Sequence, residues 1–259
     1  MSRRAIQLFS VGPQLESDLA GTLAQLSAIG ATAVEAYGVL DRAPQLAAGL
    51  SDHGLSAPSV HVPLTSPQHL HFAPAFDAAA TLGASLVIEP YVPAEKWRDR
   101  DDILITAERL NHAADAARAW GLTVGYHNHS PEFHHSFAGL SGYQVLVGAL
   151  HPDVVLEVDC YWAHVAGQDL GELIDELGDR VRALHIKDGR PVQDAFRSDP
   201  IDLSVLAQTD AGNGHVPLAL ALQHAPADCL AIVEFDAYPG DIFRAMADAL
   251  AFLGTHGVR

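Results

Sequence analysis

Residues Val124–Phe133 read VGYHNHSPEF, an apolar run that gives way abruptly to histidine, asparagine and glutamate. The same change recurs in VVLEVD (Val154–Asp159), VRALHIK (Val181–Lys187) and AIVEFD (Ala231–Asp236). Short runs rich in β-branched residues predict buried strands, because such side chains pack well on a pleated surface. Residues that can bind metals or transfer protons therefore follow four predicted strands, and we expect these strand ends to open on one shared site.

Apolar runs and helical patterns alternate along the whole chain. The predicted strands are Ala5–Val11, Ala33–Tyr37, Ser56–Val62, Ser85–Glu89, Thr123–His127, Val154–Asp159, Val181–Lys187 and Ala231–Phe235. Leucines and isoleucines at helical spacing between residues 15 and 29 predict one helix after the first strand, and similar stripes precede Gly83, Gly121 and Gly178. After Lys187 we expect a long polar loop.

Strands that are apolar on both faces and alternate with helices are typical of a parallel sheet covered on both sides. Eight such units in 259 residues predict an α/β protein with the closed (β/α)8 TIM barrel, forming a single domain over residues 1–259. An open doubly wound sheet is the alternative, but no predicted strand leads into a glycine-rich phosphate fingerprint. Gly212 and Gly214 do not follow a strand directly, so we interpret them as part of a tight turn.

The chain is acidic, with 32 Asp plus Glu, 15 Lys plus Arg and a formal net charge of -17. Because binding to polyanions depends on clustered cations, this charge argues against nucleic acid and anionic membranes as partners. The N-terminal apolar segment is interrupted by Gln7, Ser10 and Pro13 before it reaches signal-peptide length. Cys160 and Cys229 are too few for a disulfide framework, so we expect a reduced, cytoplasmic protein.

Side chains two positions apart in a strand point to the same side of the sheet. This alternation predicts which polar residues at the strand ends share the inner side of the barrel. In a barrel, the carboxyl ends of the strands form the mouth that carries the active site. Two imidazoles and two carboxylates there would suit Mn, Co, Fe or Zn. Any one of these residues alone is as readily a hydrogen-bonded loop anchor, but together they favour a metal site. We predict four ligands: His127, Asp159, His185 and Glu234.

Further polar residues near the predicted mouth are candidates for substrate contacts. Lys187, one of only two lysines, would present an ammonium group to a substrate oxyanion, unless it is an ordinary surface lysine. Glu157 would lie one layer deeper than the ligands, so we expect a structural partner for it. Trp162 is either a core residue or a wall on which a sugar stacks. His134 is expected on the surface. The other substrate-binding candidates are His61, Glu89 and Arg190.

Five stretches resemble the xylose-isomerase-like TIM barrels, the sugar phosphate isomerase/epimerase superfamily. They occur in the expected order and span most of the chain: GYHNHSPEF, EVDCYWAHVAG, LHIKDG, GNG and VEFD. The resemblance implies a divalent metal held by an acidic residue after strand five, by Asp159, by His185 and by Glu234. This chain departs from the pattern at strand five, where His127 stands at the position that is often Glu. The candidates for the missing proton carrier are His129 and Glu132.

The resemblance implies an enzyme of carbohydrate metabolism that abstracts a proton next to a carbonyl of a keto sugar or cyclitol, through an enediolate, with Glu234 as the candidate base. Return of the proton makes an epimerase or isomerase, whereas loss of a β-substituent makes a lyase or dehydratase. Two other classes stay open: a multi-zinc DNA-repair endonuclease, which the net charge disfavours, and a non-catalytic sugar-binding barrel. Few cations besides Lys187 and Arg190 lie near the mouth, which favours an unphosphorylated substrate. The oligomeric state is open, with a homo-oligomer among the possibilities.

Overall fold

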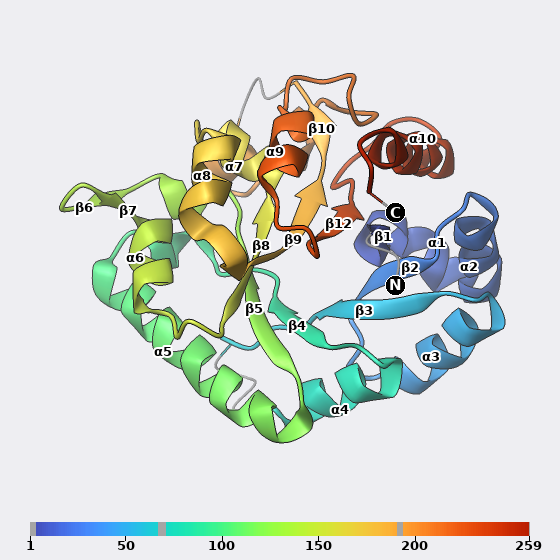
Figure 1. The fold of residues 1–259 in the computed structure, drawn as a ribbon, viewed down its shortest axis with the longest axis horizontal. Helices are drawn as coiled ribbons and strands as arrows, with labels where there is room; N and C mark the ends of the chain where they lie inside the picture. The colour runs from blue at the N-terminus through green and yellow to red at the C-terminus, as the bar shows by residue number, and fades with distance from the viewer. Residues whose placement is uncertain (1–3, 67–70, 191–193, 259) are drawn as a thin grey trace.

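The computed structural model describes residues 4–66, 71–190 and 194–258. Eight parallel strands form a closed barrel in the order β1-β12-β9-β8-β5-β4-β3-β2 (Figure 1), which confirms the predicted (β/α)8 TIM barrel. The barrel strands are β1 (Arg4–Gln7), β2 (Ala33–Tyr37), β3 (Ser56–His61), β4 (Leu86–Glu89), β5 (Thr123–His127), β8 (Val155–Asp159), β9 (Val181–Ile186) and β12 (Leu230–Val233).

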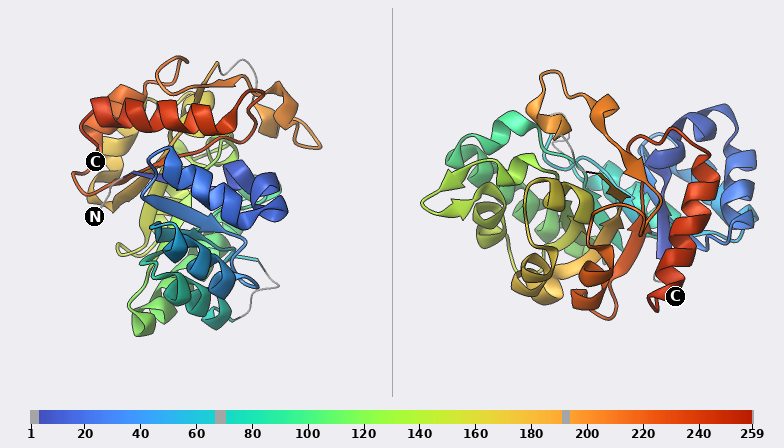
Figure 2. Two further views of the ribbon diagram at one scale, coloured as in Figure 1. Left: turned by 90° about the vertical axis from the view of Figure 1, so that its right-hand side faces the viewer. Right: turned by 90° about the horizontal axis from the view of Figure 1, so that it is seen from above.

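Helices surround the barrel and cover the outer faces of its strands (Figure 1). They are α1 (Gly12–Ser17), α2 (Leu19–Ala28), α3 (Ala43–Asp52), α4 (Ala73–Leu82), α5 (Arg100–Ala117), α6 (Gly142–Ala149), α7 (Cys160–Val165), α8 (Leu170–Leu177), α9 (Leu218–His224) and α10 (Ile242–Thr255). β1 pairs with β12 to close the barrel, and α10 packs against both strands (Figure 2). The last helix therefore covers the seam where the chain's two ends meet.

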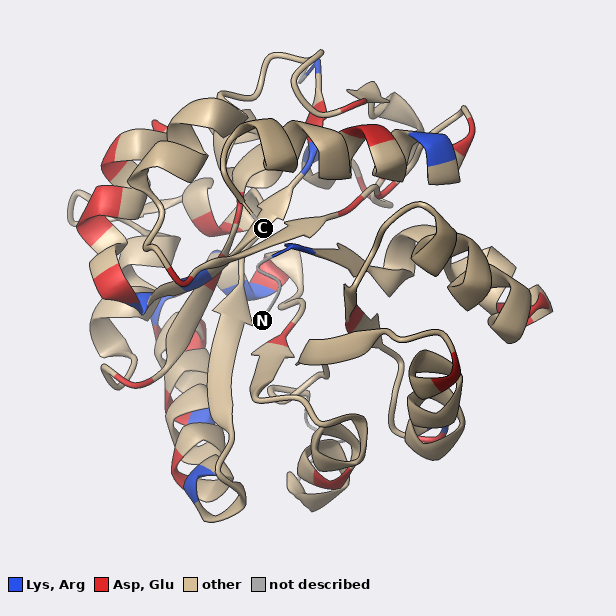
Figure 3. Cartoon of the chain, turned by 45° about the vertical axis from the view of Figure 1, so that its right-hand side comes forward, with Lys and Arg blue, Asp and Glu red and all other residues tan. Residues whose placement is uncertain are grey.

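Helix α8 illustrates how the sequence forms the outer layer. The Asp169 side chain accepts a hydrogen bond from the Glu172 backbone N–H at 3.0 Å and so caps the first turn. Apolar residues at spacings of three and four form one buried stripe: Leu170, Leu173, Ile174 and Leu177. Acidic residues lie on helices all around the barrel (Figure 3), in agreement with the negative net charge. Within the described ranges, no helix combines the length and apolar character needed to cross a bilayer.

Two predicted element boundaries near the N-terminus are wrong. The first strand ends at Gln7, because the Gln7 side chain accepts a hydrogen bond from the Phe9 backbone N–H at 3.1 Å and starts a 3-10 helix, Leu8–Val11. The single helix expected after it is divided into α1 and α2 at Asp18, which caps α2 by accepting from Gly21 N–H at 2.9 Å. In both places a polar side chain competes with the regular backbone pattern.

The predicted polar loop after β9 contains short elements. β10 (Asp188–Gly189) pairs antiparallel with β11 (Gln208–Thr209), and 3-10 helices span Ala195–Arg197 and Leu203–Val205. The Asp188 carboxylate accepts hydrogen bonds from the backbone N–H groups of Gly212, Gly214 and Val216 at 2.8 to 3.1 Å. A side chain at Gly214 would collide with this carboxylate. The GNG motif is thus a tight turn around Asp188, as predicted.

Candidate metal and active site

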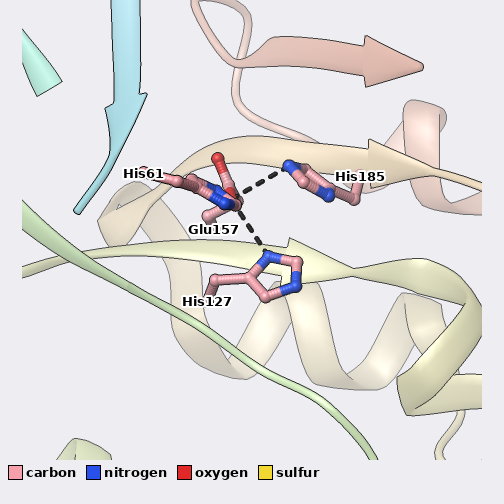
Figure 4. Close-up of side chains that lie close together, drawn as sticks. All are labelled: His61, His127, Glu157 and His185. Atoms are coloured by element: carbon pink, nitrogen blue, oxygen red, sulfur yellow. Dashed lines mark hydrogen bonds and ion pairs between the residues drawn. The ribbon is translucent and has the colours of Figure 1, made fainter. Parts of the chain in front are cut away.

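The deeper part of the barrel mouth holds a group of buried acidic and histidine side chains, which we name the lower cluster: Glu35, His61, His127, Glu157 and His185. Parallel pairing brings its members together, because β5 and β8 place His127 beside Glu157 and β8 and β9 place Asp159 beside His185. Glu157 Oε1 lies 2.7 Å from His61 Nε2 and 3.0 Å from both His127 Nδ1 and His185 Nε2 (Figure 4). The structural partner expected for Glu157 is therefore three imidazoles.

Glu35 completes the lower cluster from β2. It accepts hydrogen bonds from Gln7 Nε2 at 2.8 Å and from the Ser59 hydroxyl, and its Oε2 lies 2.7 Å from His185 Nε2 and 3.0 Å from His61 Nε2. Burial would lower the pKa of His61, but Glu35 and Glu157 raise it to about 10. Burial and Glu35 would raise the pKa of Glu157, but His185 and His61 bring it to about 2. The lower cluster thus contains an imidazolium facing ionised carboxylates.

A second group of side chains contacts the ring nitrogens of His127 and His185 that face away from Glu157. We name it the upper cluster: Asp159, Lys187, Glu234 and Asp236 with the other ring nitrogens of the two histidines. His185 Nδ1 lies 2.6 Å from Glu234 Oε2 and 4.0 Å from Asp159 Oδ2, and His127 Nε2 lies 3.7 Å from Asp159 Oδ2. The structure thus brings three of the four predicted metal ligands together, Asp159, His185 and Glu234, and places the fourth, His127, beside Asp159.

Lys187 lies among the carboxylates of the upper cluster. Its Nζ is 2.9 Å from Asp159 Oδ2, 2.6 Å from Glu234 Oε2 and 3.0 Å from Asp236 Oδ2. The alternative of an ordinary surface lysine is wrong, because Lys187 is only 1% exposed. Burial would lower the pKa of Lys187, but the three carboxylates raise it well above its usual value. The ammonium group is therefore charged and is already engaged by the protein.

Negative charge exceeds positive charge in the two clusters. Five carboxylates face one lysine and two histidines with raised pKa values. Burial raises the pKa of Asp159 to about 6 although Lys187 is adjacent, since Asp236 and Glu234 repel additional charge. Asp159 Oδ2 is buried and finds no hydrogen-bond partner among the described residues, although Lys187 Nζ lies near it. A divalent cation would offset this excess.

The donor atoms fit a divalent metal. Ligand atoms of Asp159, His185 and Glu234 all lie within 4.8 Å of one another. A second set with the same property was not predicted from the sequence: His61, His127, Glu157 and His185. Imidazole nitrogen with carboxylate oxygen is the donor combination that Zn, Mn, Fe and Co accept. His185 belongs to both sets. Because a neutral imidazole has only one lone pair, His185 can be a ligand in only one of them.

His129 lies above the upper cluster in a group of rings that we name the aromatic wall: Tyr91, His129, Trp162 and Phe196. The His129 ring is centred 4.8 Å from that of His127, 5.1 Å from that of Phe196 and 6.0 Å from that of Trp162. Burial lowers the pKa of His129 well below its usual value, and Lys187 lowers it further. His129 Nδ1 has no hydrogen-bond partner within the described part of the chain. The wall thus contains a neutral imidazole whose buried Nδ1 has no partner among the described residues.

Three other predicted site residues lie away from the clusters. Glu132 accepts hydrogen bonds from Tyr126 Oη at 2.6 Å and from the His129 backbone N–H at 2.9 Å, so it supports the segment that carries His129. Glu89 accepts from the backbone N–H groups of Leu64 and Thr65, both at 2.6 Å, as a loop anchor does. Arg190 is exposed and lies outside both clusters. By contrast, the candidates His61 and Trp162 lie in the lower cluster and the aromatic wall.

Sequence reasoning missed one connection over the mouth. Asp194 Oδ1 accepts a hydrogen bond from Ser130 Oγ at 2.7 Å, and its Oδ2 lies 2.6 Å from His134 Nε2. The expectation that His134 is a surface residue is wrong, because this contact half-buries it. Asp194 begins the 3-10 helix that contains Phe196. The pair therefore links the segment after β5 to the aromatic wall, and no local sequence signal connects residues 60 positions apart.

The closed barrel and the polar residues at its strand ends define a class of enzyme-like (β/α)8 proteins with a candidate metal centre. The family described as Xylose isomerase-like TIM barrel matches residues 23–256, so the chain belongs to that family, as its motifs predicted. A search of curated proteins found no match.

Three solved structures share the fold. A sugar phosphate isomerase/epimerase from Parabacteroides distasonis is 22% identical, with a TM-score of 0.78 over 98% of this chain and 94% of that chain. The probable 3-DHS dehydratase AsbF of Bacillus anthracis is 13% identical, with a TM-score of 0.73 over 97% and 99%. The IOLI protein with a bound zinc atom is 15% identical, with a TM-score of 0.68 over 99% and 98%. At these identities the similarity establishes the fold alone.

Proposed function

We propose that this protein is a metal-dependent isomerase or epimerase of a keto sugar or cyclitol. The supporting observation is the convergence of two imidazoles and two carboxylates in the upper cluster, with an excess of buried negative charge. The proposed ligands are His127, Asp159, His185 and Glu234. A divalent cation bound there would act as a Lewis acid on a substrate carbonyl. The isomerase/epimerase and the zinc-containing protein among the similar structures agree with this proposal.

We assign the proton transfer to His129. Burial would raise the pKa of Glu234, but Lys187 and His185 hold it well below its usual value, so Glu234 is ionised and can hold a cation. The low pKa of His129 keeps its imidazole neutral, and this half-buried ring can accept a proton from a substrate carbon. Removal of the proton next to the carbonyl would give an enediolate. Its return by His129 to the adjacent carbon completes isomerisation, whereas epimerisation needs a second group that donates a proton to the other face, for which Glu234 and Glu132 are the candidates.

The substrate class follows from the surroundings of the clusters. The rings of the aromatic wall can stack on the apolar face of a sugar or cyclitol. Lys187 is engaged by three carboxylates and is therefore not free to bind a phosphate group. Arg190 is exposed outside the clusters. These observations favour an unphosphorylated substrate.

Elemental analysis of protein purified without chelator tests the metal dependence. We expect about one equivalent of Mn, Co, Fe or Zn per chain, lost in His127→Ala and Asp159→Ala but retained in Asp52→Ala, a change at the exposed end of α3. Keto sugars and cyclitols are then screened in deuterated water for exchange of the α-proton. An epimer or isomer as product supports the proposal, whereas an eliminated product makes the protein a lyase. Absence of metal even after reconstitution would refute it and favour a sugar-binding barrel.

A further inference from the structure

The rings of His127 and His185 stand between the two clusters, with one nitrogen on each side. His127 Nδ1 lies 3.0 Å from Glu157 Oε1, while its Nε2 faces Asp159 Oδ2 at 3.7 Å. His185 Nε2 lies 2.7 Å from Glu35 Oε2 and 3.0 Å from the same oxygen of Glu157, while its Nδ1 faces Glu234 Oε2 at 2.6 Å. One carboxylate oxygen thus contacts the inner nitrogens of both rings (Figure 4).

This arrangement decides which nitrogen of each ring is free. A neutral imidazole has one N–H donor and one lone pair, and only the lone pair can bind a metal. A carboxylate that accepts the N–H of a histidine fixes its tautomer and leaves the opposite nitrogen for the metal. His127 and His185 therefore have two alternatives. Either Glu157 accepts their N–H groups and the metal binds in the upper cluster, or Glu157 is itself a ligand in the lower cluster.

Burial and access favour the first alternative. Glu157 is 0% exposed, and its Oε1 is already surrounded at hydrogen-bond distance by three ring nitrogens, the third from His61 at 2.7 Å. A metal with these ligands would be enclosed by protein, as in structural rather than catalytic sites. Glu234 is 5% exposed and follows the carboxyl end of β12, where a substrate can approach, whereas in the lower cluster only His61, at 8%, has comparable exposure and both carboxylates are fully buried. The strand geometry agrees, because Glu157 stands two positions before Asp159 on the same side of β8, one layer further in.

We propose that Glu157 is a positioning residue that holds the N–H group on His127 Nδ1 and, together with Glu35, the N–H group on His185 Nε2. When a metal replaces the proton shared by His185 Nδ1 and Glu234 Oε2, the lone pairs of His127 Nε2 and His185 Nδ1 point at the upper cluster, beside Asp159 and Glu234. This inference rests on the proposed metal-dependent function and deepens it: one carboxylate orients both imidazole ligands from behind. His61 donates to the same oxygen and keeps Glu157 in place.

Two measurements test the role of Glu157. Zinc affinity is measured by competition with a chelator for the wild type and for Glu157→Gln, and we expect the variant to bind zinc about 10 to 100 times more weakly. Glu89→Gln is the matched control, since Glu89 is equally buried at the end of β4 but accepts backbone N–H groups instead of imidazoles, and it should leave zinc affinity unchanged. Long-range proton–nitrogen NMR of the zinc-loaded wild type should show protons on His127 Nδ1 and His185 Nε2.

The outcomes separate this inference from the proposed function. Weaker zinc binding by Glu157→Gln together with the expected tautomers supports the inference. Zinc bound through His127 Nδ1 and His185 Nε2 would overturn it, because Glu157 would then belong to the metal site, while metal dependence would stand. Equal zinc affinity of Glu157→Gln and the wild type would overturn it in the same way. A wild type that binds none of Zn, Mn, Fe and Co would refute both proposals. If Glu157→Gln does not fold, the NMR measurement on the wild type still decides.

Discussion

Lys187 Nζ lies 2.6 Å from Glu234 Oε2 at a place where the two residues are only 1% and 5% exposed. Asp159 and Asp236 contact the same ammonium group. Removing one partner of a buried ion pair leaves uncompensated charge, which typically costs about 3 to 5 kcal/mol. We therefore expect Lys187→Met to lower the free energy of unfolding of the metal-free protein by about this amount, measured by urea denaturation.

The second lysine of the chain supplies the control. Lys96 pairs with Asp102 at 3.1 Å, but its side chain is 48% exposed, so Lys96→Met should change the free energy of unfolding by less than about 1 kcal/mol. Zinc should stabilise Lys187→Met more than the wild type, since a bound cation would replace the lost ammonium charge. Equal losses of stability in the two variants would contradict the ion-pair assignment.

The position of His129 in the aromatic wall allows its ring nitrogens to be tested separately from the packing of its ring. His129→Phe keeps a ring against Trp162 and Phe196 but removes the unpartnered Nδ1. We expect turnover of the substrate identified by deuterium exchange to fall about 10²- to 10⁴-fold, the usual contribution of a general acid or base. Zinc affinity should not change. His135→Gln, at an exposed position in the same segment, is the control. Full proton exchange by His129→Phe would assign the base elsewhere.

Most of the barrel could be predicted because its strands are buried on both faces. Val155–Asp159 is buried at every residue and Val181–Ile186 at all but one, as expected of strands in a parallel sheet that is covered on both faces. Strand ends were less predictable. Gln7 looks compatible with a strand extending to Val11, and only its hydrogen bond to Phe9 N–H shows why the strand stops.

The candidate site was predictable where side-chain alternation along a strand decides the position. Alternation and parallel pairing were enough to expect His127, Asp159 and His185 close together. Alternation could not show that Lys187 balances the carboxylates, because the conformation of this long side chain depends on its three ion-pair partners. The contact between His134 and Asp194 joins two loops, and its formation depends on tertiary packing that no periodic pattern encodes.

Asp194 holds the two loops over the mouth together through Ser130 Oγ and His134 Nε2. Hydrogen bonds to a charged group contribute about 1.5 to 3 kcal/mol each, so we expect Asp194→Asn to lower the free energy of unfolding by about 1 to 3 kcal/mol at neutral pH. Asp52→Asn, an exposed control, should change it by less than about 0.5 kcal/mol. Limited proteolysis should also cut the Asp194→Asn variant faster near Ala195–Arg197. Unchanged stability and proteolysis would show that the contact does not order these loops.

Glu132 makes the stability of the protein depend on pH, and a comparison of the wild type with Glu132→Gln measures this contribution. Burial raises the pKa of Glu132 to about 7, although hydrogen bonds from Tyr126 and the His129 N–H oppose this. A glutamate in the unfolded chain has a pKa of about 4.3. Between this value and the folded pKa, the carboxyl group of Glu132 is protonated in the folded state and ionised in the unfolded state. The free energy of unfolding therefore falls as pH rises through this window, by up to about 3 kcal/mol. Glu132→Gln does not titrate, so its stability relative to the wild type should increase between about pH 5 and about pH 8. A difference independent of pH would show that Glu132 is ionised throughout.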